Sequence, residues 1–190
     1  MKKYELTDEK IQVFGKTLYR ISALKSFGHV EVGQKGGYVE KESNLSQLGD
    51  AWVYGNAEVS GDAQVSGNAQ VYGNAQVSGN AWVYGDAWVY GNAEVSGDAQ
   101  VSGNAEVYGN AWVRTRTDVL WMTPVGSENG TLTVVRSKSG GLLVCRGCFS
   151  GTLGDFEKAV EQTHGNNRYA KEYKAAIAFI NLRFGMEEEK

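Results

Sequence analysis

The stretch "GNAWVYGDAWVYGNAEVSGDAQVS", residues 79–102, decides the fold of this 190-residue chain. It holds four copies of one six-residue phrase, Gly-Asn/Asp-Ala-x-Val-Ser/Tyr. The phrase runs without insertion from Gly49 to Arg114, as eleven consecutive hexapeptides. Valine recurs at every sixth position from Val53 to Val113, always two residues after an alanine. Such a strict period predicts a structure made of stacked, equal units.

The six-residue spacing favours short strands over a helix. A helix with 3.6 residues per turn would scatter alanine and valine around its circumference, whereas a strand places both on one side. The Gly-Asn or Gly-Asp pair marks a turn, because both residue types tolerate positive φ. Three strands and three turns make a triangular coil, and stacked coils pair in parallel about 4.8 Å apart. The sequence predicts a mainly β fold, a left-handed parallel β-helix of about four coils.

Two resemblances support this fold. The repeats resemble the hexapeptide-repeat family of left-handed β-helix proteins throughout residues 49–114. In addition, "KYEL" at 3–6, "TLYRISALKSF" at 17–27 and "GGYVEKESNLSQLGDAWVYGNA" at 36–57 resemble YdcK-type β-helix proteins and their phage and prophage relatives. The second resemblance implies the same fold and a phage origin, and it implies no particular activity.

Residues 1–48 are expected to form an N-terminal β cap, because a stack of coils needs its open end covered. Alternating apolar residues around a Gly15-Lys16 turn predict a hairpin. After it, residues 36–48 read as a degraded coil with Leu45 in the alanine register.

Residues 115–190 are expected to form a small α+β domain. The segment 118–125 reads as a strand, and a hairpin with its turn at Ser139-Gly140-Gly141 follows. A Thr152-x-x-Asp155 capping box begins a helix that stops at Gly165. A second helix carries the apolar stripe Tyr169, Tyr173, Ile177, Ile180 and Phe184, followed by a charged tail.

The phrases "GCFSGTLGDFEKAV" at 147–160 and "THGNN" at 163–167 are similar to a small domain of unknown function found on other phage and prophage proteins. The predicted organisation is therefore a β cap at 1–48, the β-helix at 49–114 and the α+β domain at 115–190.

The two variable positions of each hexapeptide point outward, and every third hexapeptide lies on the same face. One face collects aromatic side chains, and the other two carry mostly Ser, Gln and Glu. Tyr and Trp are enriched at binding hot spots, so this face is the candidate partner-binding surface. Three readings stay open: a ladder that only stabilises the stack, a seam of a dimer or trimer, or a surface for a foreign protein. The candidate residues are Trp52, Tyr54, Tyr72, Trp88, Tyr90 and Tyr108.

Nothing in the sequence predicts an enzyme, a metal or a cofactor. Hexapeptide acyltransferases use a coil histidine as general base, but His29 and His164 both lie outside the repeats. Cys145 and Cys148 form a CxxC without the second pair of ligands that structural zinc needs, so we interpret them as packed or half-exposed thiols. Asn and Asp at the corners favour turn chemistry over a calcium ladder. A small-ligand or nucleotide site is conceivable at the junction of β-helix and C-terminal domain, formed by Arg136, Arg146 and His164.

The charge and composition limit the kinds of molecule that the protein is expected to bind and the compartment in which it is expected to act. The net charge of −3 conceals −6 within residues 49–114, which disfavours contact of the repeats with a nucleic-acid backbone. No apolar run is long enough to span a membrane, and the first residues lack the apolar core of a secretory signal. With only two cysteines, we expect a protein of the host-cell cytoplasm.

The leading hypothesis is a non-catalytic phage or prophage scaffold for protein–protein interaction. Its sharpest form, an anti-CRISPR-like or other inhibitor of a host defence complex, rests on the phage resemblance. The alternatives are a virion or tail component, a small-ligand or nucleotide binder, and a degenerate acyltransferase.

Overall fold

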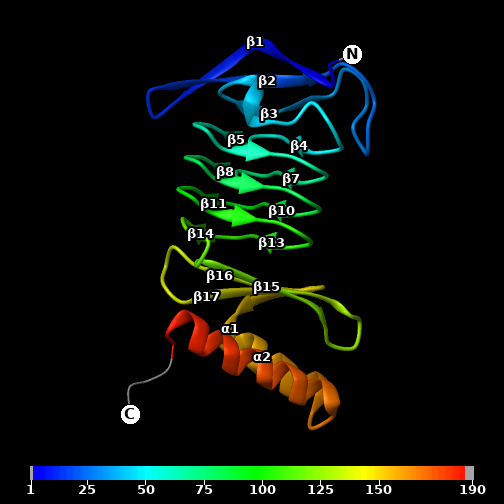
Figure 1. Ribbon diagram of the computed structural model, residues 1–190, viewed down its shortest axis with the longest axis vertical. Coiled ribbons are helices and arrows are strands. Elements are labelled where there is room, and N and C mark those ends of the chain that lie inside the picture. The colour runs from blue at the N-terminus through cyan, green and yellow to red at the C-terminus, as the bar shows by residue number, and fades with distance from the viewer. Residues whose placement is uncertain (1, 187–190) are drawn as a thin grey trace.

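The computed structural model describes residues 2–186 as an elongated stack of three parts (Figure 1). Strands from the N-terminal segment close one end, the repeats form the middle, and a sheet covered by two helices closes the other end. None of the helices in the described part of the chain is both long and apolar enough to cross a membrane.

The repeats form a parallel β-solenoid of about four turns, which confirms the predicted fold class. Each hexapeptide contributes one two-residue strand, and strands three repeats apart pair in parallel. The sheets run β4-β7-β10-β13 on the first face, β5-β8-β11-β14 on the second and β6-β9-β12 on the third. The strands are β4 (Trp52–Val53), β5 (Glu58–Val59), β6 (Gln64–Val65), β7 (Gln70–Val71), β8 (Gln76–Val77), β9 (Trp82–Val83), β10 (Trp88–Val89), β11 (Glu94–Val95), β12 (Gln100–Val101), β13 (Glu106–Val107) and β14 (Trp112–Val113).

The alanines and valines of the repeats fill the interior and are almost completely shielded from solvent. A valine from each face meets its equivalents above and below, so the core is continuous along the stack. At the corners only glycine fits: Gly73 has φ +73°, and a Cβ there would lie 3.1 Å from the backbone nitrogen of Gly91. The repeated phrase thus encodes both the core and the close stacking of the corners.

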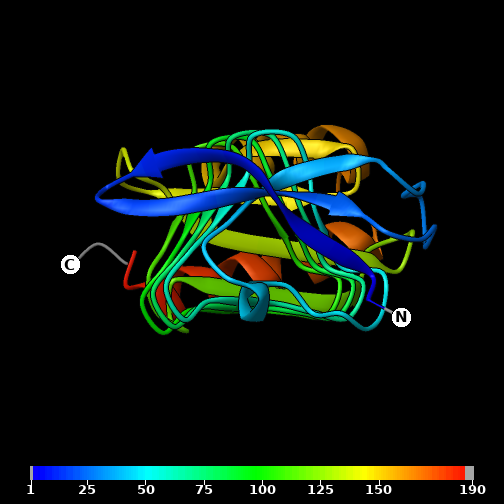
Figure 2. The same ribbon diagram turned by 90° about the horizontal axis from the view of Figure 1, so that it is seen from above.

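The N-terminal segment continues the solenoid instead of forming a separate layer. It contains β1 (Tyr4–Val13), β2 (Lys16–Ala23), β3 (Lys35–Val39) and a short 3-10 helix, Glu42–Asn44. The β1-β2 hairpin pairs with β3, and β3 pairs in parallel with β5, so all belong to one seven-stranded sheet. Viewed from above, the hairpin lies across the end of the coils (Figure 2).

Two local predictions for this segment were wrong. The hairpin turns at Phe14-Gly15, one residue earlier than expected, and both residues have positive φ. Leu45 pairs with Val65 and so takes a valine position, not an alanine position. The reason is two extra residues: Leu45 lies eight positions before Val53, where a regular repeat would place six.

The C-terminal segment forms a four-stranded antiparallel sheet with two helices on the side away from the solenoid (Figure 1). Its elements are β15 (Val119–Val125), β16 (Gly130–Arg136), β17 (Leu142–Arg146), β18 (Phe149–Thr152), α1 (Leu153–His164) and α2 (Arg168–Phe184). The short strand β18 had not been predicted as a separate element. It places the Thr152 cap at the end of the sheet, directly before α1.

The predicted helix signals are confirmed. The Thr152 hydroxyl accepts a hydrogen bond from the backbone nitrogen of Asp155, and Gly165 is the C-cap of α1. Four members of the predicted stripe on α2 are buried against the sheet and α1, whereas Tyr169 is half-buried. Residues 187–190 of the predicted charged tail lie outside the described residues.

Candidate functional site

The first face of the solenoid carries the predicted aromatic ladder. The rings of Tyr72 and Tyr90 stack with centroids 4.9 Å apart and planes 2° from parallel. Tyr108 follows at 6.0 Å from Tyr90 with a tilt of 30°. The parallel register between β7, β10 and β13 places these residues one above another, as the 18-residue period requires.

Trp52 does not belong to the accessible surface, which corrects the expectation that it contributes to partner binding there. Its side chain is 0% exposed, because the N-terminal segment folds over it. The rings of Tyr4 and Phe27 pack edge-on against it, at 6.0 and 5.4 Å between centroids. The repeat pattern alone could not show that this outward position of the first coil lies beneath the cap. Tyr54, beside it on the same coil, is half-buried.

The lower end of the ladder contacts the C-terminal sheet. The Tyr108 hydroxyl donates to the carbonyl oxygens of Val144 and Gly151, at 3.0 and 3.3 Å. The Tyr90 hydroxyl and the Cys145 thiol each donate to Oε2 of Glu106, both at 3.3 Å.

Burial, with the nearby Glu106 carboxylate as a smaller cause, raises the pKa of Cys145 to about 12. Burial likewise raises the pKa of Tyr90 far above its ordinary value, with Cys145 and Glu106 as smaller causes. Tyr108 thus links the solenoid directly to the C-terminal sheet, whereas Tyr90 is connected to that sheet through Glu106, which also accepts from Cys145.

The most exposed aromatic side chains of the solenoid lie on one nine-residue segment, "WVYGDAWVY", residues 82–90. Trp82 is 47%, Tyr84 39% and Trp88 42% exposed. The segment passes from the third face to the first around the Gly85-Asp86 corner, and the Trp88 ring packs edge-on against Tyr72 at 6.2 Å. We call Tyr72, Trp82, Tyr84, Trp88 and Tyr90 the aromatic corner.

Trp82 and Tyr84 were missed as candidates because they are the only aromatic pair on the third face. When the residues are compared within each face separately, the closeness of this pair to Trp88, which lies around the corner on the first face, does not appear. A usable signal was present: residues 79–90 are two successive hexapeptides with aromatic side chains at both variable positions.

Three basic side chains of the β16-β17 hairpin contact different partners. Arg136 pairs with Asp118 at 3.3 Å and lies over the ring of Phe184. Lys138 pairs with Glu94 at 2.6 Å. Arg146 donates from Nη2 to the carbonyl oxygen of Val125 at 2.8 Å.

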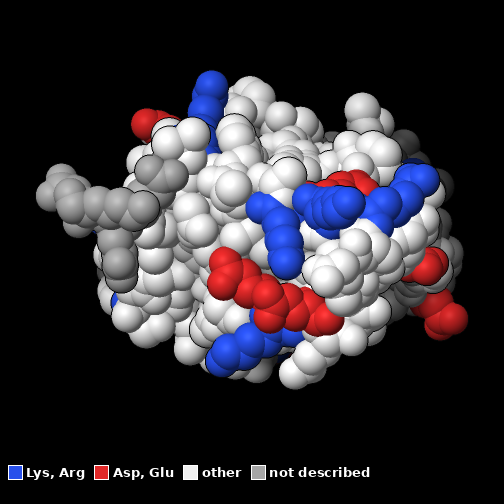
Figure 3. All heavy atoms as spheres, turned by 90° about the horizontal axis from the view of Figure 1, so that it is seen from below, with Lys and Arg blue, Asp and Glu red and all other residues white. Residues whose placement is uncertain are grey.

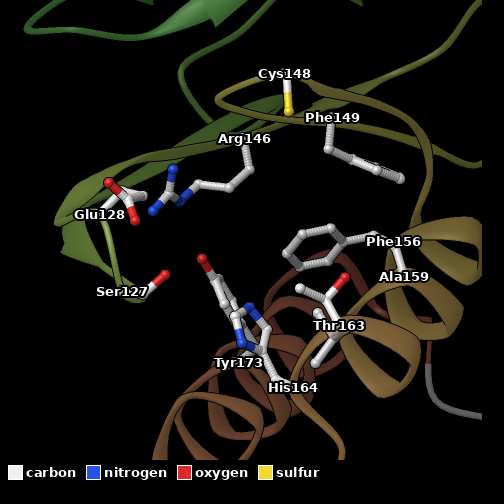
Figure 4. A pocket seen from close by; sticks show the side chains of 11 residues that line it. Ser127, Glu128, Arg146, Cys148, Phe149, Phe156, Ala159, Thr163, His164 and Tyr173 are labelled. Carbon is white, nitrogen blue, oxygen red and sulfur yellow. The ribbon is translucent and has the colours of Figure 1, made fainter.

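The predicted ligand site at the junction therefore does not assemble. In the antiparallel register of β16 and β17, Arg136 lies opposite Leu142 and Arg146 lies opposite Leu132. These positions are at opposite ends of the strand pair, so the two guanidinium groups belong to different surfaces. Arg146 and His164 do line a common hollow, but it lies within the C-terminal domain, between the sheet turns and the helices (Figure 4).

The corner residues form ladders of their own. The Asn68 amide donates to Asp86 at 2.9 Å, and the Asn80 amide donates to Asp98 at 3.1 Å, each one coil below. Asn and Asp alternate along these two corners. An amide between carboxylates supplies a donor and keeps like charges apart. In residues 2–186 there is no group of three side chains suited to holding a metal ion.

The comparison with protein families bears on the middle of the molecule. Its repeats match the YdcK β-solenoid repeat. The matched residues are 63–77, 69–85, 75–91 and 99–114, all within the solenoid described above. No curated protein matches the chain.

Proposed function

We propose that the protein is a non-catalytic scaffold that binds a partner protein through the aromatic corner. The observation that carries this proposal is the concentration of three exposed large aromatic side chains, Trp82, Tyr84 and Trp88, within nine residues of one coil. Trp and Tyr are the residue types that dominate binding energy at protein interfaces.

The solenoid does not require aromatic residues at these positions. In the same registers, Gln64 and Gln100 stand above and below Trp82, and Gln70 stands above Trp88. Ser66 and Ser102 occupy the positions equivalent to Tyr84. Since polar residues serve the neighbouring coils, stacking alone gives no reason for the aromatic ones.

The surface is also pre-organised. Each of these residues flanks a buried valine of a two-residue strand, and those strands are paired on both sides. A partner would therefore contact a surface whose backbone is already fixed, which reduces the entropy lost on binding.

A protein partner fits the charges better than a nucleic acid does. The repeats carry a net charge of −6. At the C-terminal end of the molecule, basic and acidic side chains lie side by side (Figure 3). A phosphate backbone is bound by clusters of Lys and Arg, which this mixed surface does not provide.

The sharper form of the proposal is inhibition of a host defence complex, anti-CRISPR-like or otherwise directed against defence. It is supported by the resemblance of the N-terminal segment, the repeats and the C-terminal domain to phage and prophage proteins. The site of action would be the cytoplasm of the infected cell.

The test compares the wild-type protein with a triple variant, Trp82→Gln, Tyr84→Ser and Trp88→Gln, which copies the residues of neighbouring coils. Trp112→Gln is the matched control on the second face, where Gln76 already occupies the same register. All three proteins are used to capture complexes from phage-infected bacterial lysate, and the affinity for the purified captured complex is then measured.

We expect a defence complex to bind wild type and the control equally, and the triple variant at least about 100-fold more weakly, as expected when interface anchors of about 2 kcal/mol each are lost. Equal binding by a correctly folded triple variant would refute the aromatic corner as the interface. Recovery of only virion proteins would favour a structural role in the particle, and recovery of only the protein itself would favour self-association.

A further inference from the structure

A hollow of about 240 Å³ lies inside the C-terminal domain (Figure 4). The turn between β15 and β16 borders it with Ser127 and Glu128, and the end of β17 contributes Arg146. Its walls are mostly apolar: Phe149 follows β17, Phe156 comes from α1, and these two rings pack against each other at 5.2 Å. Helix α2 contributes Tyr173.

Arg146 has more hydrogen-bonding capacity than the fold uses. Its Nη2 donates to the carbonyl oxygen of Val125, which fixes the guanidinium in place. Its Nε is enclosed and has no hydrogen-bond partner in the described residues. Within residues 2–186 no carboxylate lies within 4.0 Å of its nitrogens, although Glu128 borders the same hollow. A guanidinium without an ion pair, at the edge of an apolar hollow, is set to bind an anion.

Tyr173 presents a second polar group. Its side chain is only 4% exposed, and Phe156 and His164 pack against its ring at 5.4 and 5.5 Å. The hydroxyl has no hydrogen-bond partner among the described side chains and backbone groups. In Figure 4 it points toward the side of the hollow where the Arg146 guanidinium lies. Buried polar groups in native proteins are nearly always paired, and the enclosed Arg146 Nε is an exception. The Tyr173 hydroxyl is a solvent-accessible donor on the same hollow, so the two groups together leave a place for an acceptor.

We propose that this hollow binds a small organic carboxylate, whose oxygens accept from Arg146 and the Tyr173 hydroxyl while its apolar body contacts Phe149 and Phe156. A carboxylate matches the planar fork of a guanidinium. A monoanion fits better than a phosphate dianion, because among the described residues Arg146 is the one Lys or Arg that lines the hollow, and Glu128 also borders it. A hollow of about 240 Å³ has room for a small organic acid.

This site is independent of the aromatic corner. Its lining residues all belong to the C-terminal domain, residues 127–173, whereas the aromatic corner lies within residues 72–90 of the solenoid, so either proposal can fail without the other.

The test uses three probes: benzoate, its neutral analogue benzamide, and phenyl phosphate as a dianion. Each is titrated into the isotope-labelled full-length protein, and binding is followed by the backbone amide shifts of the residues that line the hollow. The variants are Arg146→Gln and Tyr173→Phe, and Arg136→Gln is the control, because Arg136 lies outside the hollow.

We expect saturable shifts with benzoate at these residues, and binding of benzamide and phenyl phosphate at least about tenfold weaker, as for loss of one charge-assisted hydrogen bond. Arg146→Gln should weaken benzoate at least about tenfold and Arg136→Gln should leave it unchanged. Tyr173→Phe keeps the buried ring and should weaken benzoate several-fold, so it serves if Arg146→Gln does not fold. Equal affinity for benzoate and benzamide, tighter binding of the dianion, or no saturable shift with any probe would overturn the proposal.

Discussion

The two ends of the solenoid are closed in different ways. At the N-terminal end the backbone continues the pattern: β3 pairs in parallel with β5, and Leu45 bridges to Val65. At the C-terminal end an antiparallel sheet crosses beneath the last coil, joined by one backbone bridge, Ala111 to Ser137. Side chains supply other contacts there, among them Tyr108 to β17 and Lys138 to Glu94.

The difference shows two solutions to one problem. An open edge of paired strands exposes unpaired backbone groups that invite aggregation. At the N-terminal end the Asn44 amide donates to the carbonyl oxygens of Gly61 and Ala63, completing what a further coil would provide. At the other end the strands run in a new direction, so specific side chains replace the regular ladder. We therefore expect large losses from changes at the first end and small, local losses at the second.

The largest effect is expected from Trp52→Ala. The Trp52 ring fills the space between the first coil and the cap, so its removal leaves a cavity and should cost about 3–5 kcal/mol of the free energy of unfolding. Trp88→Ala is the matched control, because Trp88 stands two coils below in the same register and is 42% exposed. It should cost about 1 kcal/mol, because the half-exposed ring loses its edge-on contact with Tyr72. Urea unfolding of both variants measures the difference.

Equal losses for the two tryptophans would contradict the cap as a structural plug. It would mean that the N-terminal segment detaches easily from the first coil, and Trp52 would return to the candidate surface.

The sequence predicted the solenoid in detail and its two ends only in outline, for a physical reason. Eleven hexapeptides repeat the same local pattern. A misleading residue in one repeat does not change the prediction, because the neighbouring repeats indicate the same structure. The ends are unique: the two extra residues after Leu45 shifted its register, and β18 has only four residues with little apolar pattern. Their form depends on contacts distant in sequence, such as Tyr4 with Trp52, which no local pattern encodes.

A change of pH should have an intermediate effect on the free energy of unfolding. The sign should differ between Lys3 at the N-terminal end and Cys145 at the C-terminal end. Burial lowers the pKa of Lys3 to about 8, opposed by Asp50 and reinforced by Lys25, while its ammonium donates to the Ala51 carbonyl oxygen at 2.8 Å. Between about pH 8 and 10 the unfolded chain therefore binds more protons at Lys3, so folding stability rises with pH. Cys145 keeps its proton when folded, so above its unfolded pKa of about 8.5 its contribution falls as pH rises.

The measurement is urea unfolding of wild type, Lys3→Met and Cys145→Ala between about pH 7 and pH 10. The free energy of unfolding of wild type, relative to that of Lys3→Met, should increase by about 2 kcal/mol over that range. The free-energy advantage of wild type over Cys145→Ala should shrink by about 2 kcal/mol over the same range. If both differences are flat with pH, neither side chain is as buried in solution as the structure places it.

The candidate sites were predictable only in part. The stacked tyrosines follow directly from the 18-residue period, but burial does not: Trp52 is covered by the cap, and Tyr108 contacts the C-terminal sheet. Arg146 and His164 were recognised as chemically useful, yet their hollow depends on how α1 packs on the sheet. Arg136, which looked equivalent in sequence, lies at the other end of its strand pair.

The smallest effect is expected from Tyr108→Phe, at the C-terminal end. The change removes one hydroxyl that donates to the carbonyl oxygens of Val144 and Gly151, and should cost about 1 kcal/mol. Tyr72→Phe is the control in the same ladder, because its hydroxyl has no hydrogen-bond partner in residues 2–186; it should be nearly neutral. Amide hydrogen exchange should show the loss from Tyr108→Phe concentrated in β17 and β18, since a contact made by side chains at one edge need not open the solenoid. An equal loss of protection along the coils would show instead that this end is as cooperative with the repeats as the N-terminal cap is.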